Sequence, residues 1–298
     1  MTKFPVKTGE ALHTPIMVEE VLQYMRISKL GTYLDCTVGY GGHAHFIIKQ
    51  LSKNGKLLGI DKDEKAIKFC KKTLSAYNNI HLFHNSYNNI SDILSSSQIK
   101  EVDGMLLDLG LSSAQLDSYT RGFSYKINSE LDMRFDLNQK LKAENILNSY
   151  SKKEIADIIY KYGEVKSSRI IANNILKMRP IKSVFELVEA IRISTPPKNR
   201  YRIIARVFQA IRIKVNNELS NLENFLSSFC NQLSIGGRII FISFHSLEDR
   251  LVKHSLKSLS NENKIKILTK KPIYPSEKEK LTNSRSKSAK LRAAERIS

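Results

Sequence analysis

Short apolar runs alternate with helix-like stretches from residue 32 onward, and this alternation leaves few folds open to the chain. The runs Tyr33–Val38, Leu57–Asp61, Ile80–Phe83 and Val102–Leu109 have the length of strands. The last run is apolar almost throughout apart from its acids, which is typical of a strand buried on both faces. Strands that alternate with helices indicate a parallel sheet with right-handed crossovers. We therefore expect an α/β, Rossmann-like fold.

The alternation stops for about a hundred residues between Gln115 and Val215, where the spacing of apolar residues is helical throughout. Two capping-box patterns support helices there, Ser151-x-x-Glu154 and Ser183-x-x-Glu186. The prolines mark interruptions, with Pro180 ending one helix and Pro196–Pro197 preceding a basic helix over Arg200–Lys214.

The α/β pattern then resumes with a helix over Glu218–Leu233, a turn at Gly236–Gly237 and a strand over Arg238–Phe244. Ile265–Leu268 and Ala289–Ala293 are candidates for the last strands, separated by a polar loop. The sequence thus predicts a discontinuous α/β domain over residues 1–114 and 215–298, with a helical insert over residues 115–214.

The net charge of +19 is concentrated in two segments. Residues 121–214 hold 20 Lys and Arg against 9 Asp and Glu, and residues 262–298 hold 11 against 4, whereas the rest of the chain holds 17 against 16. Such concentration favours an electrostatic footprint for a polyanion such as RNA. A Lys-rich, solvated surface remains the alternative. No basic amphipathic helix with a broad apolar face points to a membrane surface.

The three cysteines, Cys36, Cys70 and Cys230, are scattered and have no CxxC spacing, so neither a disulfide framework nor a zinc site is expected. No run reaches the roughly 18 apolar residues of a membrane span, and the first 20 residues do not resemble a secretory leader. We expect a cytoplasmic protein without a metal site.

A glycine-rich turn follows the first predicted strand. Its pattern, Gly39-x-Gly41-x-x-Ala44, lets backbone N–H groups approach a ligand at the start of a helix. Asp61 ends the second strand, where a carboxylate can accept hydrogen bonds from both hydroxyls of an adenosine ribose. This pair of features serves S-adenosylmethionine and NAD equally. A tight turn and a helix N-cap are the purely structural alternatives.

Two acids favour the methyl donor over the nicotinamide. Asp35 lies in the first strand just before the glycines, and Asp108 ends the fourth strand, where a transferred methyl group would lie. No hydride-transfer apparatus is apparent beside the predicted cofactor turn. Two other classes of protein stay open. A nicotinamide-dependent oxidoreductase would explain the glycines but not the positive charge of the insert. A non-catalytic RNA-binding factor would explain the charge but not the glycines.

Several motifs resemble one family along nearly the whole chain. They include His13-Thr-Pro-Ile-Met-Val-Glu-Glu-Val21, Asp103-Gly-Met-Leu-Leu-Asp-Leu-Gly-Leu-Ser-Ser113, Phe208-Gln-Ala-Ile-Arg212, Ile242-Ser-Phe-His-Ser-Leu-Glu-Asp-Arg250 and Ser288-Ala-Lys-Leu-Arg292. They are similar to the bacterial ribosomal RNA small-subunit methyltransferase H (MraW) family. The resemblance implies transfer of a methyl group from S-adenosylmethionine to the exocyclic N4 amine of a cytidine in 16S rRNA near the decoding centre. It also implies small-subunit rRNA, or the assembling 30S subunit, as partner.

The resemblance further implies a set of cofactor-binding residues: Gly41, Gly42, His43, Asp61, Tyr87, Asp108 and Gln115. The turn would present N–H groups to the methionine end, Asp61 would hold the ribose, and Tyr87 would pack beside the adenine. Gln115 would serve the methionine end or the substrate mouth. One position departs from the family pattern, since Tyr40 stands where a small residue is usual.

The chemistry needs a hydrogen-bond acceptor beside the cytosine amine, whose lone pair is delocalised into the ring. Asp108 is the first candidate for this catalytic role, and it could equally act on the cofactor alone. His245, after the strand Arg238–Phe244, is the second candidate, with a structural hydrogen bond to backbone as the alternative. Asp132 and Arg134 could shape the substrate pocket or form a structural ion pair.

Overall fold

The computed structural model describes residues 15–298, and the chain folds into two compact units. The sheet unit comprises the described residues up to Gly110 together with Leu219–Ser298. The helical unit comprises Leu111–Glu218. The limits expected from the sequence, at residues 114 and 215, lie close to these.

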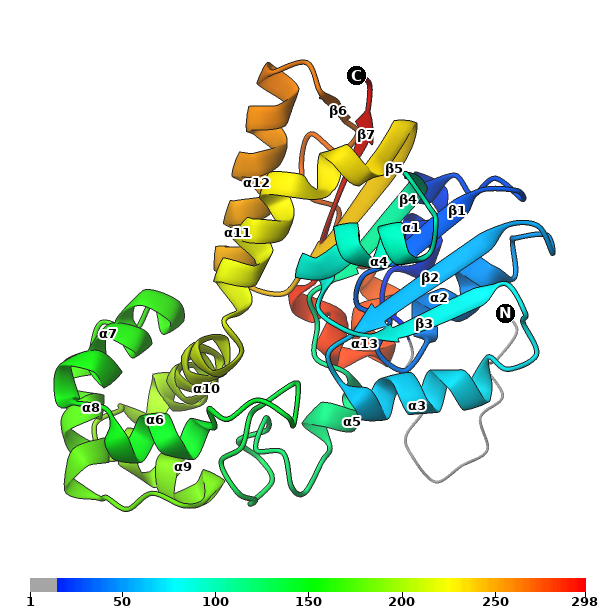
Figure 1. Ribbon diagram of the computed structural model, residues 1–298. Coiled ribbons are helices and arrows are strands. Elements are labelled where there is room, and N and C mark those ends of the chain that lie inside the picture. The colour runs from blue at the N-terminus through cyan, green and yellow to red at the C-terminus, as the bar shows by residue number, and fades with distance from the viewer. Residues whose placement is uncertain (1–14) are drawn as a thin grey trace. The chain divides into compact units, whose positions relative to one another are not determined.

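The sheet unit contains a seven-stranded sheet in the order β3-β2-β1-β4-β5-β7-β6 (Figure 1). Its strands are β1 (Thr32–Asp35), β2 (Lys56–Asp61), β3 (Ile80–His84), β4 (Val102–Asp108), β5 (Leu233–Ser243), β6 (Ile265–Ile267) and β7 (Lys290–Arg296). The strands from β3 to β5 pair in parallel, and β7 lies antiparallel between β5 and β6. This is the doubly wound nucleotide-binding order with one antiparallel strand added. The predicted α/β, Rossmann-like class is confirmed, in the form expected of class I S-adenosylmethionine-dependent methyltransferases.

Helices cover both faces of this sheet, because each face carries its own apolar cluster. On one face pack α1 (Val18–Met25), α2 (Gly42–Ile48) and α3 (Glu64–Thr73). On the other pack α4 (Ile90–Ser96), α11 (Glu218–Ser228) and α12 (Ser246–Asn261). The central strand β4 contributes to both clusters, with Met105 and Leu107 on one face and Leu106 on the other. Its apolar sequence is explained by this double burial.

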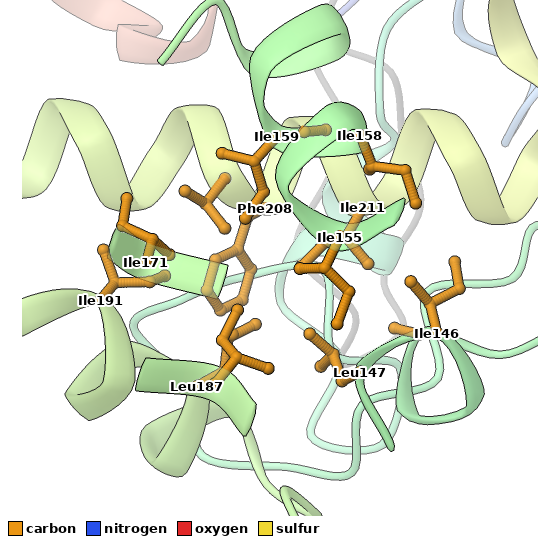
Figure 2. Close-up of a cluster of buried hydrophobic side chains, with 14 of the residues drawn as sticks. Ile146, Leu147, Ile155, Ile158, Ile159, Ile171, Leu187, Ile191, Phe208 and Ile211 are labelled. Atoms are coloured by element: carbon orange, nitrogen blue, oxygen red, sulfur yellow. The ribbon is translucent and has the colours of Figure 1, made fainter. Parts of the chain in front are cut away.

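The helical unit is built around a separate core (Figure 2). Its helices are α5 (Ser113–Leu116), α6 (Ala143–Ser149), α7 (Lys152–Gly163), α8 (Ser168–Lys177), α9 (Val184–Arg192) and α10 (Arg200–Asn216). Helix α10 supplies Phe208 and Ile211 to this core, where they meet Ile155 and Ile159 of α7. Both predicted capping boxes are confirmed: Ser151 caps α7 and Ser183 caps α9.

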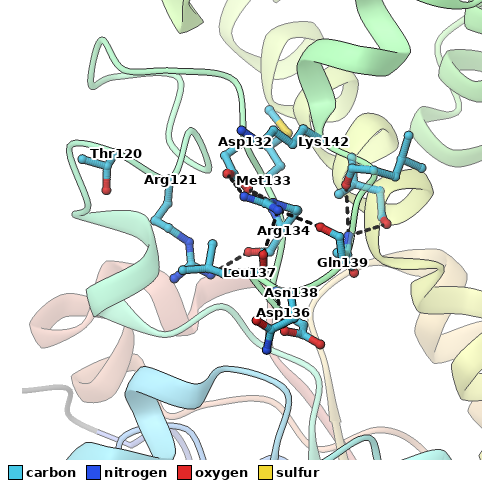
Figure 3. A network of polar contacts seen from close by, with 12 residues as sticks. Thr120, Arg121, Asp132, Met133, Arg134, Asp136, Leu137, Asn138, Gln139 and Lys142 are labelled. Atoms are coloured by element: carbon cyan, nitrogen blue, oxygen red, sulfur yellow. Dashed lines mark hydrogen bonds and ion pairs between the residues drawn. The ribbon is translucent and has the colours of Figure 1, made fainter.

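An irregular segment between α5 and α6 is held by a network of polar contacts (Figure 3). Arg134 forms a bidentate ion pair with Asp132, with N···O distances of 2.8 Å, and donates to the carbonyl oxygens of Leu137 and Gln139. Arg121 donates to the carbonyls of Arg134 and Phe135. The structural ion pair considered for Asp132 and Arg134 is therefore present, and it substitutes for regular backbone pairing in this segment.

Two local expectations were wrong. Gly236 and Gly237 do not precede the fifth strand but lie within β5, where the pairing with β4 shifts register between Val102 and Gly104. The polar stretch before β7 is not simply a loop, since it contains α13 (Glu277–Thr282), capped by the side chain of Ser276. Within residues 15–298, no helix is both long enough and apolar enough to cross a membrane.

Candidate cofactor and active site

The carboxyl ends of β1, β2 and β4 meet at one edge of the sheet, because these three neighbouring strands run in parallel. The chain leaves β1 towards β2 on one side, and β4 lies on the other side, so this edge is a topological switch point. Ligands of open α/β sheets bind in the crevice outside such a point. The turn Gly39–Gly42, which leads into α2, lies here.

Hydrogen bonds hold the segment after β1 between its two neighbours. Cys36 N–H donates to Leu106 O (2.9 Å), and Val38 N–H donates to Ile60 O (2.8 Å). Asp108 N–H donates to the hydroxyl of Thr37 (2.7 Å). The backbone that enters the glycine turn is thereby tied to both flanking strands.

Two glycines of the turn have left-handed backbone angles, with φ of 51° at Gly39 and 81° at Gly41. A Cβ atom on Gly41 would lie 3.1 Å from the sulfur of Cys70. Both positions therefore favour glycine. The departure at Tyr40 is accommodated by its ring packing against Phe69, with the ring centroids 5.1 Å apart.

Asp61, at the end of β2, braces this turn. Gly39 N–H donates to Asp61 Oδ2 and Asp63 N–H donates to Oδ1, each at 2.8 Å. Asp61 is not the N-cap of α3, because Asp63 fills that position. Burial raises the pKa of Asp61 to about 6, although both backbone donors oppose the rise. Each carboxylate oxygen keeps a lone pair for a further donor.

Asp35, at the end of β1, is buried, with 1% of its surface exposed. Its Oδ1 accepts a hydrogen bond from Thr37 N–H, whereas Oδ2 has no partner among the described residues. Burial raises the pKa of Asp35 to about 8, and the carboxylates of Asp108 and Asp61 contribute to the rise. Through Thr37, this acid holds the backbone that leads into the glycine turn.

Asp108, at the end of β4, lies beside His43 of α2. Its Oδ1 accepts from Gly110 N–H, and its Oδ2 lies 3.7 Å from His43 Nδ1. Burial raises the pKa of Asp108, an effect that His43 opposes. His43 Nε2 lies 2.9 Å from Ile16 O, and because a carbonyl only accepts, that nitrogen carries a proton. In the neutral ring Nδ1 is therefore an acceptor facing the carboxyl group of Asp108. No local sequence pattern predicts this side-chain contact.

Tyr87 follows β3 and begins a short 3₁₀ turn, Tyr87–Asn89. Its ring meets Phe225 edge to face, at 5.5 Å between centroids, and Lys62 Nζ lies 5.8 Å from its centre. A partly exposed aromatic surface next to the end of β2 suits a purine base.

His245, after β5, is the N-cap of α12. Its Nδ1 accepts from Glu248 N–H at 3.4 Å, and its Nε2 lies 3.0 Å from Glu248 Oε1. Glu248 in turn accepts from the N–H groups of Phe244 and His245. The structural hydrogen bond to backbone, considered above as the alternative for His245, is therefore present. It occupies Nδ1, the ring nitrogen that could otherwise accept a proton from a substrate.

The remaining predicted positions belong to the helical unit or lie in a motif that is only partly described. Gln115 belongs to the helical unit, where it closes a capping box with Ser112 at the start of α5. Asp132 and Arg134 belong to the same unit. The first two residues of the motif at positions 13–21 lie outside the described residues.

The three carboxyl groups of Asp35, Asp61 and Asp108 lie at this edge, where burial disfavours their ionised forms. His43 lies beside Asp108, and no Lys or Arg within residues 15–298 forms an ion pair with any of the three. A ligand that brings a positive charge and hydroxyl donors fits this set. The sulfonium and ribose of S-adenosylmethionine have both.

Comparison with known proteins agrees with this geometry. The sequence pattern of the MraW methylase family matches residues 10–297. The chain belongs to this family. It is 47% identical to the ribosomal RNA small subunit methyltransferase H of Thermosipho africanus, over 97% of this chain and 99% of the relative. It is 46% identical to the protein of the same name from Kosmotoga olearia, over 96% and 97%.

Solved structures give a weaker likeness. A crystal structure of an rRNA methylase from Streptococcus thermophilus covers 94% of this chain with 11% identity and a TM-score of 0.43. The family membership itself decides between the cofactors left open by the glycine turn. The cofactor is S-adenosylmethionine, and the chain is a methyltransferase.

The burial of Asp35 predicts how stability changes with pH. Its pKa is about 8 in the folded protein against roughly 3.9 when unfolded, so the folded state binds more protons between these values. Its contribution to stability is full below pH ~4 and is lost as the pH rises through 8. Replacing Asp35 by Asn removes this ionisation, so the unfolding midpoint of Asp35→Asn should fall less between pH 5 and pH 8 than that of the unsubstituted protein.

Thermal unfolding across this pH range measures the effect. Asp92→Asn on the exposed face of α4 is the matched control and should follow the unsubstituted protein. Parallel pH curves for Asp35→Asn and the unsubstituted protein would contradict the expectation.

Proposed function

We propose that the protein transfers a methyl group from S-adenosylmethionine to the exocyclic N4 amine of one cytidine in small-subunit (16S) rRNA, near the decoding centre. The observation that carries the proposal is the trio of carboxyl groups around the glycine turn. It suits a cationic methyl donor, and Asp108 supplies an acceptor of raised pKa where the methyl group would be transferred. The names of the relatives support small-subunit rRNA as the substrate.

In this proposal the turn residues Gly41, Gly42 and His43 direct backbone N–H groups at the methionine carboxylate, at the start of α2. Asp61 accepts hydrogen bonds from the ribose hydroxyls through the lone pairs that the backbone leaves open. Tyr87 packs beside the adenine. Gln115 contributes to the methionine end or the substrate mouth.

When bound, S-adenosylmethionine supplies a methyl group activated by its sulfonium, so positioning accounts for most of the catalysis. Asp108 accepts a hydrogen bond from the N4 amine, which favours a pyramidal nitrogen, and then takes the proton that N4 releases. His43 Nδ1 faces this carboxyl group at 3.7 Å and would accept a hydrogen bond from its protonated form after a small approach. His245 is the second candidate for the base, but it would first have to give up the cap of α12.

Cofactor binding should depend on Asp61, because one carboxylate accepts from two hydroxyls and charged hydrogen bonds contribute about 1.5–3 kcal/mol. Asp61→Ala should weaken S-adenosylmethionine binding at least about tenfold by calorimetry. Asp61→Asn keeps one oxygen that can accept from a backbone N–H group. Comparing the two variants separates the contact of Asp61 with the ribose from its support of the glycine turn. If Asp61→Ala binds the cofactor with unchanged affinity, Asp61 has no part in the site.

The helical unit is the proposed RNA-binding surface, together with the basic segment after residue 262. Four cations lie at the start of α10 and just before it: Lys198, Arg200, Arg202 and Arg206. Arg200 and Arg206 donate to backbone carbonyls at 3.4 Å and not to carboxylates. Their charge is therefore not neutralised by these contacts and can attract phosphate groups.

RNA affinity should therefore fall steeply with salt, because bound phosphates release counterions. Replacing Lys198, Arg200, Arg202 and Arg206 together by Gln should weaken RNA binding and flatten its dependence on salt, while cofactor affinity stays unchanged. Filter binding over a range of salt concentrations measures both effects. An unaltered salt slope would place the RNA elsewhere on the protein.

Transfer to N4 must be distinguished from transfer to carbon 5, which needs a cysteine thiolate to add to the ring. All three cysteines are buried. Burial raises the pKa of the Cys36 and Cys70 thiols well above the ordinary range, and Cys70 donates its S–H to Gly39 O. Thiols in this state supply no nucleophile at neutral pH.

A variant with Cys36, Cys70 and Cys230 all replaced by Ala should thus keep substantial methylation activity, whereas Asp108→Ala should lose it. Digestion of the product RNA and mass spectrometry should yield N4-methylcytidine. Detection of 5-methylcytidine, or an inactive cysteine-free variant that is folded and binds the cofactor, would overturn the mechanism.

A further inference from the structure

The single tyrosine of α10, Tyr201, lies among the cations just described. Tyr201 is 73% exposed, and its chain neighbours are Arg200 and Arg202. The exposed Ala205 follows by four residues and so shares the outward face of α10 with Tyr201. Arg200 and Arg202 flank that face, and Lys198 lies in the short 3₁₀ turn just before the helix. Because Ala205 has a small side chain, the residue one turn after Tyr201 on this face leaves the tyrosine ring uncovered.

This segment is free of acidic residues. Residues 193–217 contain six Lys and Arg but no Asp or Glu. The first turn of α10 likewise contains no acid, although carboxylates are the favoured charges at a helix start and cations there are unfavourable. Folding alone gives no reason for this arrangement, whereas a polyanionic partner does.

A second exposed tyrosine of the same unit shows the contrast. Tyr160 of α7 is 64% exposed, yet Asp157 and Glu164 lie one turn away on either side of it. An exposed ring by itself is common on protein surfaces. At Tyr201 the ring is open, its chain neighbours are cations and α10 itself holds no carboxylate, although Glu189 of α9 acts on Arg200. Tyr160 lacks this combination.

We propose that Tyr201 is a stacking platform for an unpaired base of the RNA, with Lys198, Arg200 and Arg202 holding the phosphates on either side of that base. The inference rests on the proposed function, since it takes RNA to be the substrate. Single-stranded RNA is recognised by unstacked bases that lie on aromatic rings within a basic surface. The base bound here is not the target cytidine, which has to enter the methyl-transfer site.

The chain offers a direct test, because it contains no tryptophan. Tyr201→Trp introduces a single indole whose fluorescence reports stacking of a base. Titration with a mixed-sequence single-stranded RNA should quench it, whereas a fully paired duplex of the same length should not. Tyr160→Trp is the matched control and should show no quenching with either RNA.

Affinity provides the second measurement. Tyr201→Ala should weaken binding of the single-stranded RNA about tenfold, the effect typical of one lost base stack, and Tyr201→Phe should retain it. The salt slope of Tyr201→Ala should equal that of the unsubstituted protein, because no phosphate contact is removed. Loss of a structural feature would instead change the slope or the thermal unfolding midpoint.

The outcomes separate this inference from the function on which it rests. Fluorescence anisotropy of labelled RNA reports binding independently of stacking. Binding without quenching at position 201, equal quenching at positions 160 and 201, or unchanged affinity in Tyr201→Ala would overturn the stacking platform and leave the proposed function standing. Failure of the unsubstituted protein to bind any RNA would remove both.

Discussion

The attachment of the segment after β1 to its two neighbouring strands is the constraint on which the site depends. Val38 is bonded to β2 through Ile60, and Thr37 accepts a hydrogen bond from Asp108 of β4. The glycine turn therefore starts from a backbone fixed on both sides, and Asp61 extends the attachment to Gly39. Parallel strand pairing brings Asp35, Asp61 and Asp108, which are distant in the sequence, to the same edge of the sheet. No direct bond joins these three acids.

This arrangement has an electrostatic cost. Three carboxyl groups share the edge without a Lys or Arg ion pair from the described residues, and the pKa of each is raised chiefly by burial. A core selected for stability alone would not retain them, since buried charge without a partner is destabilising. The cost is understandable if a cationic ligand completes the site, because its charge favours the ionised carboxylates that burial disfavours.

Features encoded by local sequence could be predicted, and features that depend on distant contacts could not. The buried strand β4 and the caps at Ser151 and Ser183 follow from residues a few positions apart. The hydrogen bond of His43 to Ile16 spans 27 residues and leaves no periodic signal. Gly236 was misread for a related reason. Glycines usually indicate a turn, but here they lie in an irregularity within β5, where the pairing with β4 passes from Leu233 directly to Arg238.

The carboxyl groups at the cofactor edge also bear on how RNA can be bound. Carboxylates that suit a sulfonium repel phosphates, so the residues that hold the donor cannot also supply affinity for a polyanion. That affinity has to come from cations in another part of the chain, and the charge surplus of residues 121–214 lies in the helical unit, which folds around its own core. With an inserted unit of this kind, acids in the sheet unit can suit the cationic methyl donor while cations in the helical unit attract phosphates. Each set of residues belongs to a unit with its own core, so neither disturbs the packing of the other.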